Sequence, residues 1–409
     1  MRMLISAGEA SGEMYGAQLI AALRRKYAHV GAGVSPAQPS PSSAAKPKTG
    51  QVGTPVPTQT LDFFGVGGDC MRAAGCDTIV DSKDLAVVGI TEILAHLPKI
   101  WGLFHKLIAE ADKRKPDLAI VIDSPAFNWR VAREMHKRGV PVVYYVAPQF
   151  WAWRQGRVRL LREYITKALV IFPFEEKFYR DRGVDATFIG HPLADLPKPN
   201  ISRDAFAAQH NLDSNKHWIA LMPGSRVKEV RMNVPEIIAA ATRLGATYEF
   251  LLPVASTLAP TLLNSLLGGN ANIRLVPETL RALAFSRAGI IASGTATVEA
   301  AMMNLPFVMV YRVTPLTYLL GKSRVKVPHF AMVNLIAERE VVPELVQHDF
   351  TAEKIVAHMN QIIPEGSARA KMLAGLAEVR ARLGEGAGHL PAADRAADII
   401  RGMLRNHHL

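Results

Sequence analysis

Short apolar runs alternate along the chain with longer stretches of helical pattern, and this alternation restricts the fold more than any other feature. Strand, helix and strand in repeated succession are typical of a parallel sheet with helices on both faces. Such strands are buried on both sides, so unbroken apolar runs are expected. The predicted strands are Met3–Ala7, Leu61–Val66, Leu118–Ile122, Val142–Val146, Leu169–Ile171, Thr187–Ile189, Ile219–Met222, Glu249–Pro253, Ile273–Val276, Ala288–Ala292 and Pro306–Val310.

The strands form two sets, which predicts an α/β fold of two doubly wound, Rossmann-like domains. A chain of 409 residues with 49% hydrophobic residues suits two domains of about 150–200 residues each. A proline-rich stretch at 192–199 separates the sets, so we predict domains 1–197 and 198–409, and we consider that the last helices pack back on the first domain. Residues 31–60 are rich in Pro, Ser, Ala and Gly and are predicted to be a disordered low-complexity insertion.

Charge and composition narrow the partners. A net charge of +12 favours an anionic membrane surface, phosphate-bearing substrates or nucleic acid. Nucleic acid is not expected, because no recognition-helix, zinc-finger or RNP pattern occurs. Two cysteines, Cys70 and Cys76, are too few for a disulfide framework and indicate a reducing compartment. Neither a signal peptide nor a membrane span is recognisable, so a cytoplasmic or peripheral protein is expected.

Two motifs of the first half follow predicted strands, where doubly wound sheets bind ligands. The first, residues 6–13, has two glycines around Glu9 and Ser11 and opens a helix whose amides could face a ligand. The second places Asp123 at the end of an apolar strand, where partial desolvation would make it a better base. The alternatives are an ordinary tight turn and a helix N-cap, respectively.

A third motif, residues 144–154, ends in Trp-Ala-Trp-Arg. Its tryptophans, with Arg154 and Arg157 beside them, could stack on a sugar or line an acyl pocket. The other interpretation is core packing beside a solvated basic helix. We assign Trp153 and Arg154, together with Ser11 and Asn128, to acceptor binding.

The second half carries two anion-binding turns. Gly224, Ser225 and Arg226 follow a strand at a helix start and would form a pyrophosphate cradle of amides, a hydroxyl and a guanidinium. It is not a Walker loop. The second turn, 293–299, has Ser293, Gly294 and Thr295 at a helix start and Glu299 one turn on, within reach of ribose hydroxyls, although a plain N-cap explains it almost as well.

No metal site is expected, because the histidines lack metal-binding spacings and no Asp-x-Asp pair occurs. We therefore predict neither a metal nor another cofactor. Residues 91–115 form a predicted helix with more apolar positions than one buried stripe needs, flanked by lysines, which is typical of an interfacial helix. The alternative is an amphipathic helix that covers the sheet. The side chains expected at the membrane are Leu97, Ile100, Trp101, Phe104 and Leu107.

Taken together, many segments in order resemble the lipid-A-disaccharide synthase family. The resemblance covers nearly the whole chain except residues 31–60. The most specific segment is 311–318, which continues through 326–328, 334–335 and 339–345. The other matching segments are Ala7–Gly12, Gly65–Gly68, Val88–Leu94, Ile122–Asn128, Pro148–Arg154, Phe172–Phe178, Gly190–Asp195, Pro223–Arg226 and Ser293–Ala301.

The resemblance implies a GT-B type glycosyltransferase with an inter-domain cleft, acting on the cytoplasmic face of the inner membrane. The first domain would bind 2,3-diacylglucosamine 1-phosphate and the second UDP-2,3-diacylglucosamine, with a β-1,6-linked disaccharide 1-phosphate and UDP as products. A homodimer is a further partner to consider. The family's important acids and arginine match Glu9, Asp123 and Arg226, and its donor segments include Tyr311, Arg312 and Asn334.

The chain departs from the family pattern at three positions. Ala126 and Glu13 stand where members often have Asp, and Glu338 stands where many have Gly. Ala126 therefore removes one candidate base. For an inverting reaction we predict Asp123 as the base that takes the acceptor hydroxyl proton, with His191 as the second candidate. The alternative functions are another UDP-sugar enzyme of this fold, a hexosyltransferase or epimerase, and a non-enzymatic anionic-lipid-binding protein.

Overall fold

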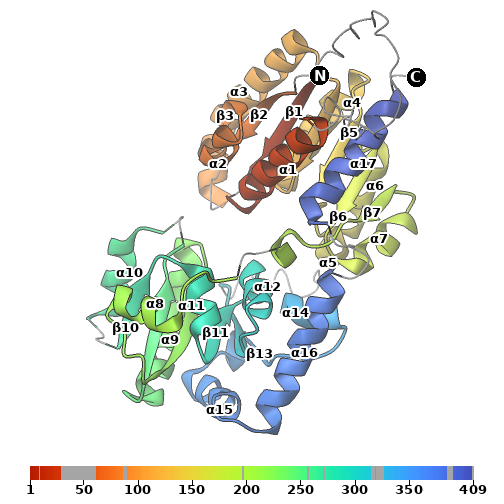
Figure 1. Ribbon diagram of the computed structural model, residues 1–409. Coiled ribbons are helices and arrows are strands. Elements are labelled where there is room, and N and C mark those ends of the chain that lie inside the picture. Colours follow the sequence, from red (N-terminus) through yellow and green to blue (C-terminus); the bar gives the residue numbers. More distant parts are fainter. Residues whose placement is uncertain are drawn as a thin grey trace, which may run out of the picture.

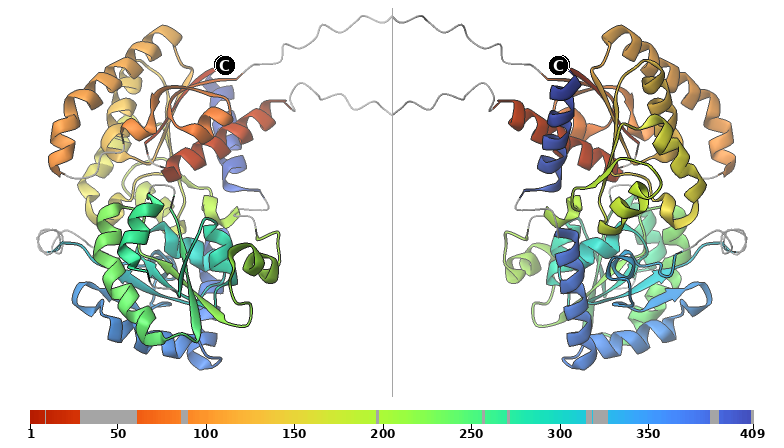
Figure 2. Two further views of the ribbon diagram at one scale, coloured as in Figure 1. Left: turned by 90° about the vertical axis from the view of Figure 1, so that its left-hand side faces the viewer. Right: turned by 90° about the vertical axis from the view of Figure 1, so that its right-hand side faces the viewer.

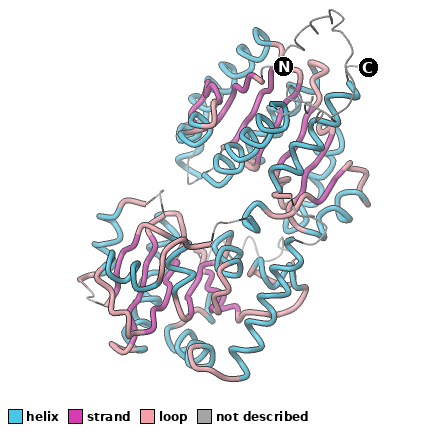
Figure 3. Tube along the Cα trace, viewed as in Figure 1, coloured by secondary structure: helices cyan, strands magenta, loops and turns pink. Residues whose placement is uncertain are grey.

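The protein has two α/β lobes, each built on one parallel sheet (Figure 1). The computed structural model describes residues 1–8, 10–28, 61–85, 90–195, 198–255, 258–269, 272–314, 318, 327–384 and 390–407. The insertion predicted at 31–60 lies outside these residues. Helices cover both faces of each sheet (Figure 3), so the prediction of two doubly wound domains is confirmed.

The first lobe has a seven-stranded sheet in the order β3-β2-β1-β4-β5-β6-β7. Every pair of neighbouring strands is parallel. The direction of winding reverses between β1 and β4, which lie side by side with Ala7 opposite Ile122. The strands are β1 (Arg2–Ala7), β2 (Asp62–Gly67), β3 (Cys76–Asp81), β4 (Leu118–Ile122), β5 (Val142–Tyr145), β6 (Lys167–Val170) and β7 (Ala186–Phe188).

The second lobe has a six-stranded sheet in the order β10-β9-β8-β11-β12-β13, again parallel throughout. Here the winding reverses between β8 and β11, where Ile291 lies opposite Met222. The strands are β8 (His217–Met222), β9 (Tyr248–Pro253), β10 (Ile273–Val276), β11 (Ala288–Ala292), β12 (Phe307–Tyr311) and β13 (Glu344–Val346).

Apolar side chains on the two faces of the first sheet form separate cores. Met3 and Ile5 of β1 pack toward the first helix, whereas Leu4 points to the opposite core. The helices of this lobe are α1 (Ala10–Ala28), α2 (Asp69–Ala73), α3 (Ile90–Arg114), α4 (Pro125–Lys137), α5 (Phe150–Trp153), α6 (Val158–Tyr164) and α7 (Pro173–Arg180), with 3-10 turns η1 (Ser82–Asp84), η2 (Gln155–Arg157) and η3 (Pro192–Asp195).

The helices of the second lobe follow the same scheme, and the last of them, α16, packs on α12 and α14. They are α8 (Arg203–His210), α9 (Val227–Leu244), α10 (Pro260–Leu267), α11 (Thr279–Phe285), α12 (Thr295–Met302), α14 (Met332–Ala337), α15 (Ala352–Ile362) and α16 (Ser367–Gly384), with the 3-10 turn η4 (Gln347–Asp349).

The final helix, α17 (Ala392–His407), returns to the first lobe and lies beside α1 (Figures 1 and 2). Its acids pair with the basic end of α1: Asp394 accepts from Arg25 at 2.9 Å, and Asp398 from Lys26 at 2.7 Å. Arg395 donates to the carbonyls of Ile189 and Phe188, at the end of β7, at 2.7 and 2.8 Å. The helices α16 and α17, which are consecutive among the described helices, therefore belong to different lobes.

Candidate active site

Four strand-to-helix turns converge where the lobes face each other. They follow β1 and β4 in the first sheet and β8 and β11 in the second, which are the strands on either side of each reversal. In doubly wound sheets ligands bind at the carboxyl ends of these strands. In Figure 1 the carboxyl ends of β1 and β11, marked by the starts of α1 and α12, point toward the other lobe.

The turns after β1 and β4 touch. A Cβ atom on Gly8 would lie 2.5 Å from the Ser124 hydroxyl oxygen, so only glycine allows this approach. Asp123 and Ser124 both have φ of +45°, in the left-handed region. That conformation costs roughly 1–2 kcal/mol per residue for side chains other than glycine, and it persists only where surrounding contacts impose it.

Two polar side chains impose the conformation of this turn. Asn128, fully buried in α4, donates to the carbonyls of Ile122 and Asp123 at 2.8 Å each. Its Oδ1 accepts from the Ser6 hydroxyl at 2.7 Å, and the Tyr144 hydroxyl donates to the Asp123 carbonyl at 2.8 Å. Asn128 thus holds the turn in which Asp123 lies, and its expected contact with the acceptor stays a prediction.

The turn after β8 is more open. Gly224 has φ of +123°, and a Cβ atom there would lie 2.8 Å from a carboxylate oxygen of Glu229. Arg226, at the N-cap of α9, donates to Glu229 at 2.9 Å, and its side chain is 55% exposed. Buried Asn233 donates to the Pro223 carbonyl at 2.8 Å and holds the turn from below. The predicted phosphate cradle is therefore accessible.

The turn after β11 is shaped in a similar way. Gly294 has φ of +135° and open space where a Cβ would be, while the Ser293 hydroxyl donates to the Phe330 carbonyl at 2.8 Å. Thr295 is exposed at the first position of α12. One turn on, burial raises the pKa of Glu299. The first turn of α12 is thus available to an anion.

Tyr15 links the two lobes electrostatically. Its pKa is raised mainly by burial and further by the negative charges of Glu299 and Asp123. Tyr15 lies on α1, Asp123 follows β4, and Glu299 lies on α12 of the other lobe. The candidate base and the candidate donor helix are therefore close to the same side chain.

The remaining residues predicted to bind the donor substrate make contacts within the second lobe. Tyr311 stacks on Phe330 with ring centroids 5.7 Å apart, and its pKa is raised by burial and by Glu229. Arg312 lies over the Phe350 ring at 4.6 Å. Buried Asn334 donates to the Val342 carbonyl at 2.9 Å and to Glu344, and its Oδ1 accepts two backbone N–H bonds. Ligand contacts of these three residues stay predictions.

The second candidate base is a poor one. His191 is buried, and burial lowers its pKa to about 3. Its Nδ1 accepts from the Leu193 amide at 3.1 Å. Of the other predicted residues, Ser11 lies in the first turn of α1 and Arg154 is exposed between α5 and η2. Glu9 lies outside the described residues, and so does the side chain of Trp153.

The predicted membrane side chains on α3 divide into two groups. Trp101 and Leu97 are exposed, at 46% and 39%, and Ile100 is half-buried. Phe104 and Leu107 instead belong to the core, where Phe104 meets Phe127 edge-on at 5.9 Å. This corrects the predicted interfacial surface: Phe104 and Leu107 cover the sheet and are not available to a membrane.

Tyr144 was not predicted as a residue of the site. It is one of two tyrosines at the end of β5, and a buried tyrosine usually directs its hydroxyl to a hydrogen-bond partner. In the ranges that the structure describes, no group of three or more His, Cys, Asp or Glu side chains could hold a metal ion. Nor is any helix in those ranges long and apolar enough to cross a membrane.

The solved structures with this fold include a UDP-GlcNAc 2-epimerase and a glycosyltransferase. A UDP-GlcNAc 2-epimerase from Neisseria meningitidis, solved with UDP-GlcNAc, matches with a TM-score of 0.60 at 13% identity, over 99% of this chain and 100% of that chain. The calicheamicin glycosyltransferase CalG4 matches with a TM-score of 0.59 at 14% identity, over 99% and 98%. These likenesses identify the fold as the GT-B type.

Sequence comparison is far more specific. The family model described as lipid-A-disaccharide synthetase matches residues 43–392. A lipid-A-disaccharide synthase from Koribacter versatilis (strain Ellin345) is 50% identical, over 97% of both chains. One from Acidobacterium capsulatum is 47% identical, over 93% of this chain and 91% of the relative. This chain therefore belongs to the lipid-A-disaccharide synthase family.

Proposed function

We propose that this protein is an inverting hexosyltransferase that joins UDP-2,3-diacylglucosamine to 2,3-diacylglucosamine 1-phosphate. The products are the β-1,6-linked disaccharide 1-phosphate of lipid A and UDP. Family membership over nearly the full length of the relatives supports this activity. An epimerase shares the fold but not this sequence family, so that alternative is not favoured.

The observation that carries the proposal is the pairing of unlike turns across the lobes. The first lobe contributes an acid, Asp123, in a turn fixed by Asn128 and Tyr144. The second contributes two glycine turns at helix starts, with exposed Arg226 beside one of them. The site would therefore offer a base for the acceptor hydroxyl. It would also offer positive charge for the leaving diphosphate.

In the proposed reaction the Asp123 carboxylate accepts the proton of the acceptor 6-hydroxyl. The 6-oxygen then forms a bond to the anomeric carbon of the donor, on the face opposite UDP, while the bond to the UDP oxygen breaks. Attack from the opposite face converts an α-linked donor into a β-linked product. His191 is the weaker choice of base because it is buried and its Nδ1 already accepts from the Leu193 amide. Glu9 is assigned to the same site by family resemblance.

Arg226 and the amides of Gly224 and Ser225 would bind the diphosphate, and the start of α12 at Thr295 would add its helix dipole. Glu299 would accept from ribose hydroxyls. Positive charge from Arg226 takes the role that a divalent cation has in other transferases, so we expect turnover without added metal. Full activity in the presence of a chelator is the check.

We propose the cytoplasmic face of the inner membrane as the place of action, because both substrates are lipids. Exposed Leu97 and Trp101 on α3 would contact the acyl boundary, with the lysines of the helix near anionic headgroups. This surface is smaller than the sequence predicts, since Phe104 and Leu107 are not part of it.

The experiment incubates the purified protein with both acylated substrates and follows UDP release and disaccharide formation by mass spectrometry. The proposal expects one UDP per disaccharide and a β linkage. UDP-sugar conversion without an acceptor product would indicate an epimerase. Binding of anionic vesicles without any turnover would indicate a lipid-binding protein.

A further inference from the structure

An arginine-lined hollow opens beside the acid turn of the first lobe. It lies between α4 and the α5–η2–α6 segment and has a volume of about 880 Å³, within the range of about 300–1,000 Å³ typical of small-molecule sites. Four arginines line it: Arg130, Arg154, Arg157 and Arg159. We call this surface the arginine hollow. No Asp or Glu is among its lining residues.

The arginine hollow has apolar walls where α4 meets α6. Arg130 lies over the ring of Trp129, 4.7 Å from its centroid, and donates to the Ala126 carbonyl. A guanidinium has five N–H donors, so a contact of this kind orients it and leaves donors for a ligand. Trp129 and Leu160 line the hollow as well. The chemistry suits an anion attached to an apolar body.

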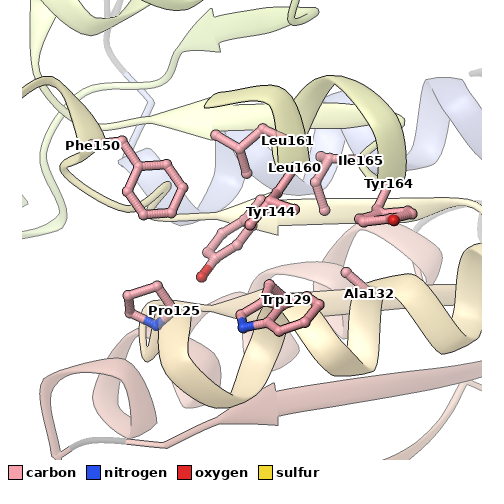
Figure 4. A pocket seen from close by; sticks show the side chains of 9 residues that line it. All are labelled: Pro125, Trp129, Ala132, Tyr144, Phe150, Leu160, Leu161, Tyr164 and Ile165. Carbon is pink, nitrogen blue, oxygen red and sulfur yellow. The ribbon is translucent and has the colours of Figure 1, made fainter. Parts of the chain in front are cut away.

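The same two residues, Trp129 and Leu160, also belong to a packed apolar layer beneath the hollow (Figure 4). The space left there is about 10 Å³, about the size of one water molecule, so this layer holds no acyl chain. Its function is structural: it fixes Tyr144, whose hydroxyl donates to the Asp123 carbonyl. The arginine hollow and the candidate base are therefore held by one packed unit.

Asp123 and the first residue of the arginine hollow are also close together in the sequence. Pro125 of the packed layer and Ala126 of the arginine hollow lie two and three positions after Asp123. In the proposed acceptor, the 6-hydroxyl and the 1-phosphate are carried on C5 and C1, the two carbons on either side of the ring oxygen, so both groups lie within one sugar unit. A sugar whose hydroxyl reaches Asp123 would thus carry its phosphate toward the positive charge of α4 and η2.

From this arrangement we infer that the arginine hollow binds the phosphate monoester of the acylated sugar acceptor. The inference rests on the proposed function and extends it from the base to the phosphate. Arg130 and Arg157 donate to the phosphate oxygens, and Arg154 and Arg159 add positive potential at the rim. Arginine suits this role because its planar fork matches phosphate oxygens.

The test compares two acceptors, the 1-phosphate and its 1-O-methyl counterpart, in detergent micelles. The variant is Arg130→Gln/Arg157→Gln. The matched control is Arg133→Gln/Arg182→Gln, which removes the same charge from exposed positions outside the hollow. With about tenfold for each charge-assisted contact, KM for the phosphate acceptor should rise about a hundredfold in the variant only. KM for the methyl acceptor should not change.

Other outcomes overturn the inference in distinct ways. An unchanged KM for the phosphate acceptor removes the subsite while the proposed function stands. An equal rise for both acceptors, together with lost binding to phosphatidylglycerol vesicles, assigns the hollow to a lipid headgroup instead. If the wild-type protein forms no disaccharide, the proposed function fails. Calorimetric binding of the two acceptors without donor then decides the subsite by itself: phosphate preference that the variant loses supports it, and equal affinities reject it.

Discussion

The turn after β4 and the turn after β8 both flank the reversal of winding in their sheets, yet they are built differently. Each is held from below by a buried asparagine, Asn128 in one and Asn233 in the other. In the first lobe, two residues with side chains, Asp123 and Ser124, adopt left-handed conformations. In the second lobe, the left-handed position is a glycine, Gly224.

The difference indicates that the two turns have separate roles. A strained turn with several fixed contacts places one carboxylate with little freedom, which is what proton transfer needs. A glycine turn beside an exposed arginine presents backbone amides and charge, which is what a diphosphate needs. The acid turn should therefore control the rate of the chemical step, and the glycine turn should control donor affinity.

The largest expected effect follows from removing the acid. Asp123→Asn should lower kcat by about 10²–10⁴, the usual contribution of a general base. Donor affinity should stay near that of the wild-type protein, because the donor turn is in the other lobe. Rapid-quench measurement of disaccharide formation, with calorimetric UDP binding, tests both parts. A variant that keeps a tenth of the normal rate would remove Asp123 from the role of base.

Substitution of Asn128 and of Asn233 tests whether the two turns have these separate roles. Asn128→Ala leaves the Ile122 and Asp123 carbonyls without their donor, which should lower unfolding free energy by about 1–3 kcal/mol. A base displaced by about 1 Å can cost about a hundredfold in rate, so kcat should fall. Asn233→Ala should instead raise KM for the donor, because it frees the Pro223 carbonyl. The assignment of separate roles to the two turns is wrong if both variants change the same kinetic constant.

A smaller effect concerns pH. Burial depresses the pKa of His191 to about 3 in the folded state, against about 6.5 when unfolded. The unfolded chain therefore binds the proton first, and stability present above about pH 6.5 is lost as pH falls toward 3, by at most about 1.4 kcal/mol per pH unit. His191→Asn should flatten this slope in urea unfolding between pH 6 and 4 while keeping kcat near the wild-type value. A collapse of kcat with unchanged stability would make His191 the base.

The smallest effect is expected for Trp101 on α3. Trp101→Glu should change unfolding free energy by no more than about 0.5 kcal/mol, as expected for an exposed position, and should weaken binding to anionic vesicles. Phe104→Ala, one turn away in the core, should cost roughly 3–5 kcal/mol. Urea unfolding and vesicle sedimentation separate the two. Vesicle binding that survives Trp101→Glu would place the membrane contact elsewhere.

Central strands and the turns at their ends could be predicted from the sequence because both leave local signals. Burial on both faces produces unbroken apolar runs such as Leu118–Ile122, and glycine beside a helix start marks the ligand turns. The edge strands β3 and β13 were missed. Cys76–Asp81 is only partly buried and mixes polar with apolar residues, and Glu344–Val346 is three residues long.

Long-range contacts could not be predicted, for a physical reason. The sequence suggests that Asn128 contacts a ligand, because it lies close after Asp123. In the structure its hydrogen-bond partners include Ser6, 122 positions away. From the sequence, Phe104 is predicted to be an exposed apolar residue of the helix. The prediction fails because the sequence does not show that Phe127 packs against it. The arginines of the hollow come from two segments, α4 and residues 154–159, that only the fold brings together.

The most direct measurement of the central claim compares Asp123→Asn with Arg226→Ala in one set of single-turnover experiments at varied donor concentration. Asp123→Asn should lower the maximal rate and leave the donor Kd unchanged. Arg226→Ala should raise the donor Kd, with a loss of about 1.5–3 kcal/mol of binding free energy, the value of a charge-assisted contact, and should lower the maximal rate less than Asp123→Asn does. If Arg226→Ala leaves the donor Kd unchanged, or Asp123→Asn raises it while the maximal rate is kept, the assignment of acid and donor turns is contradicted.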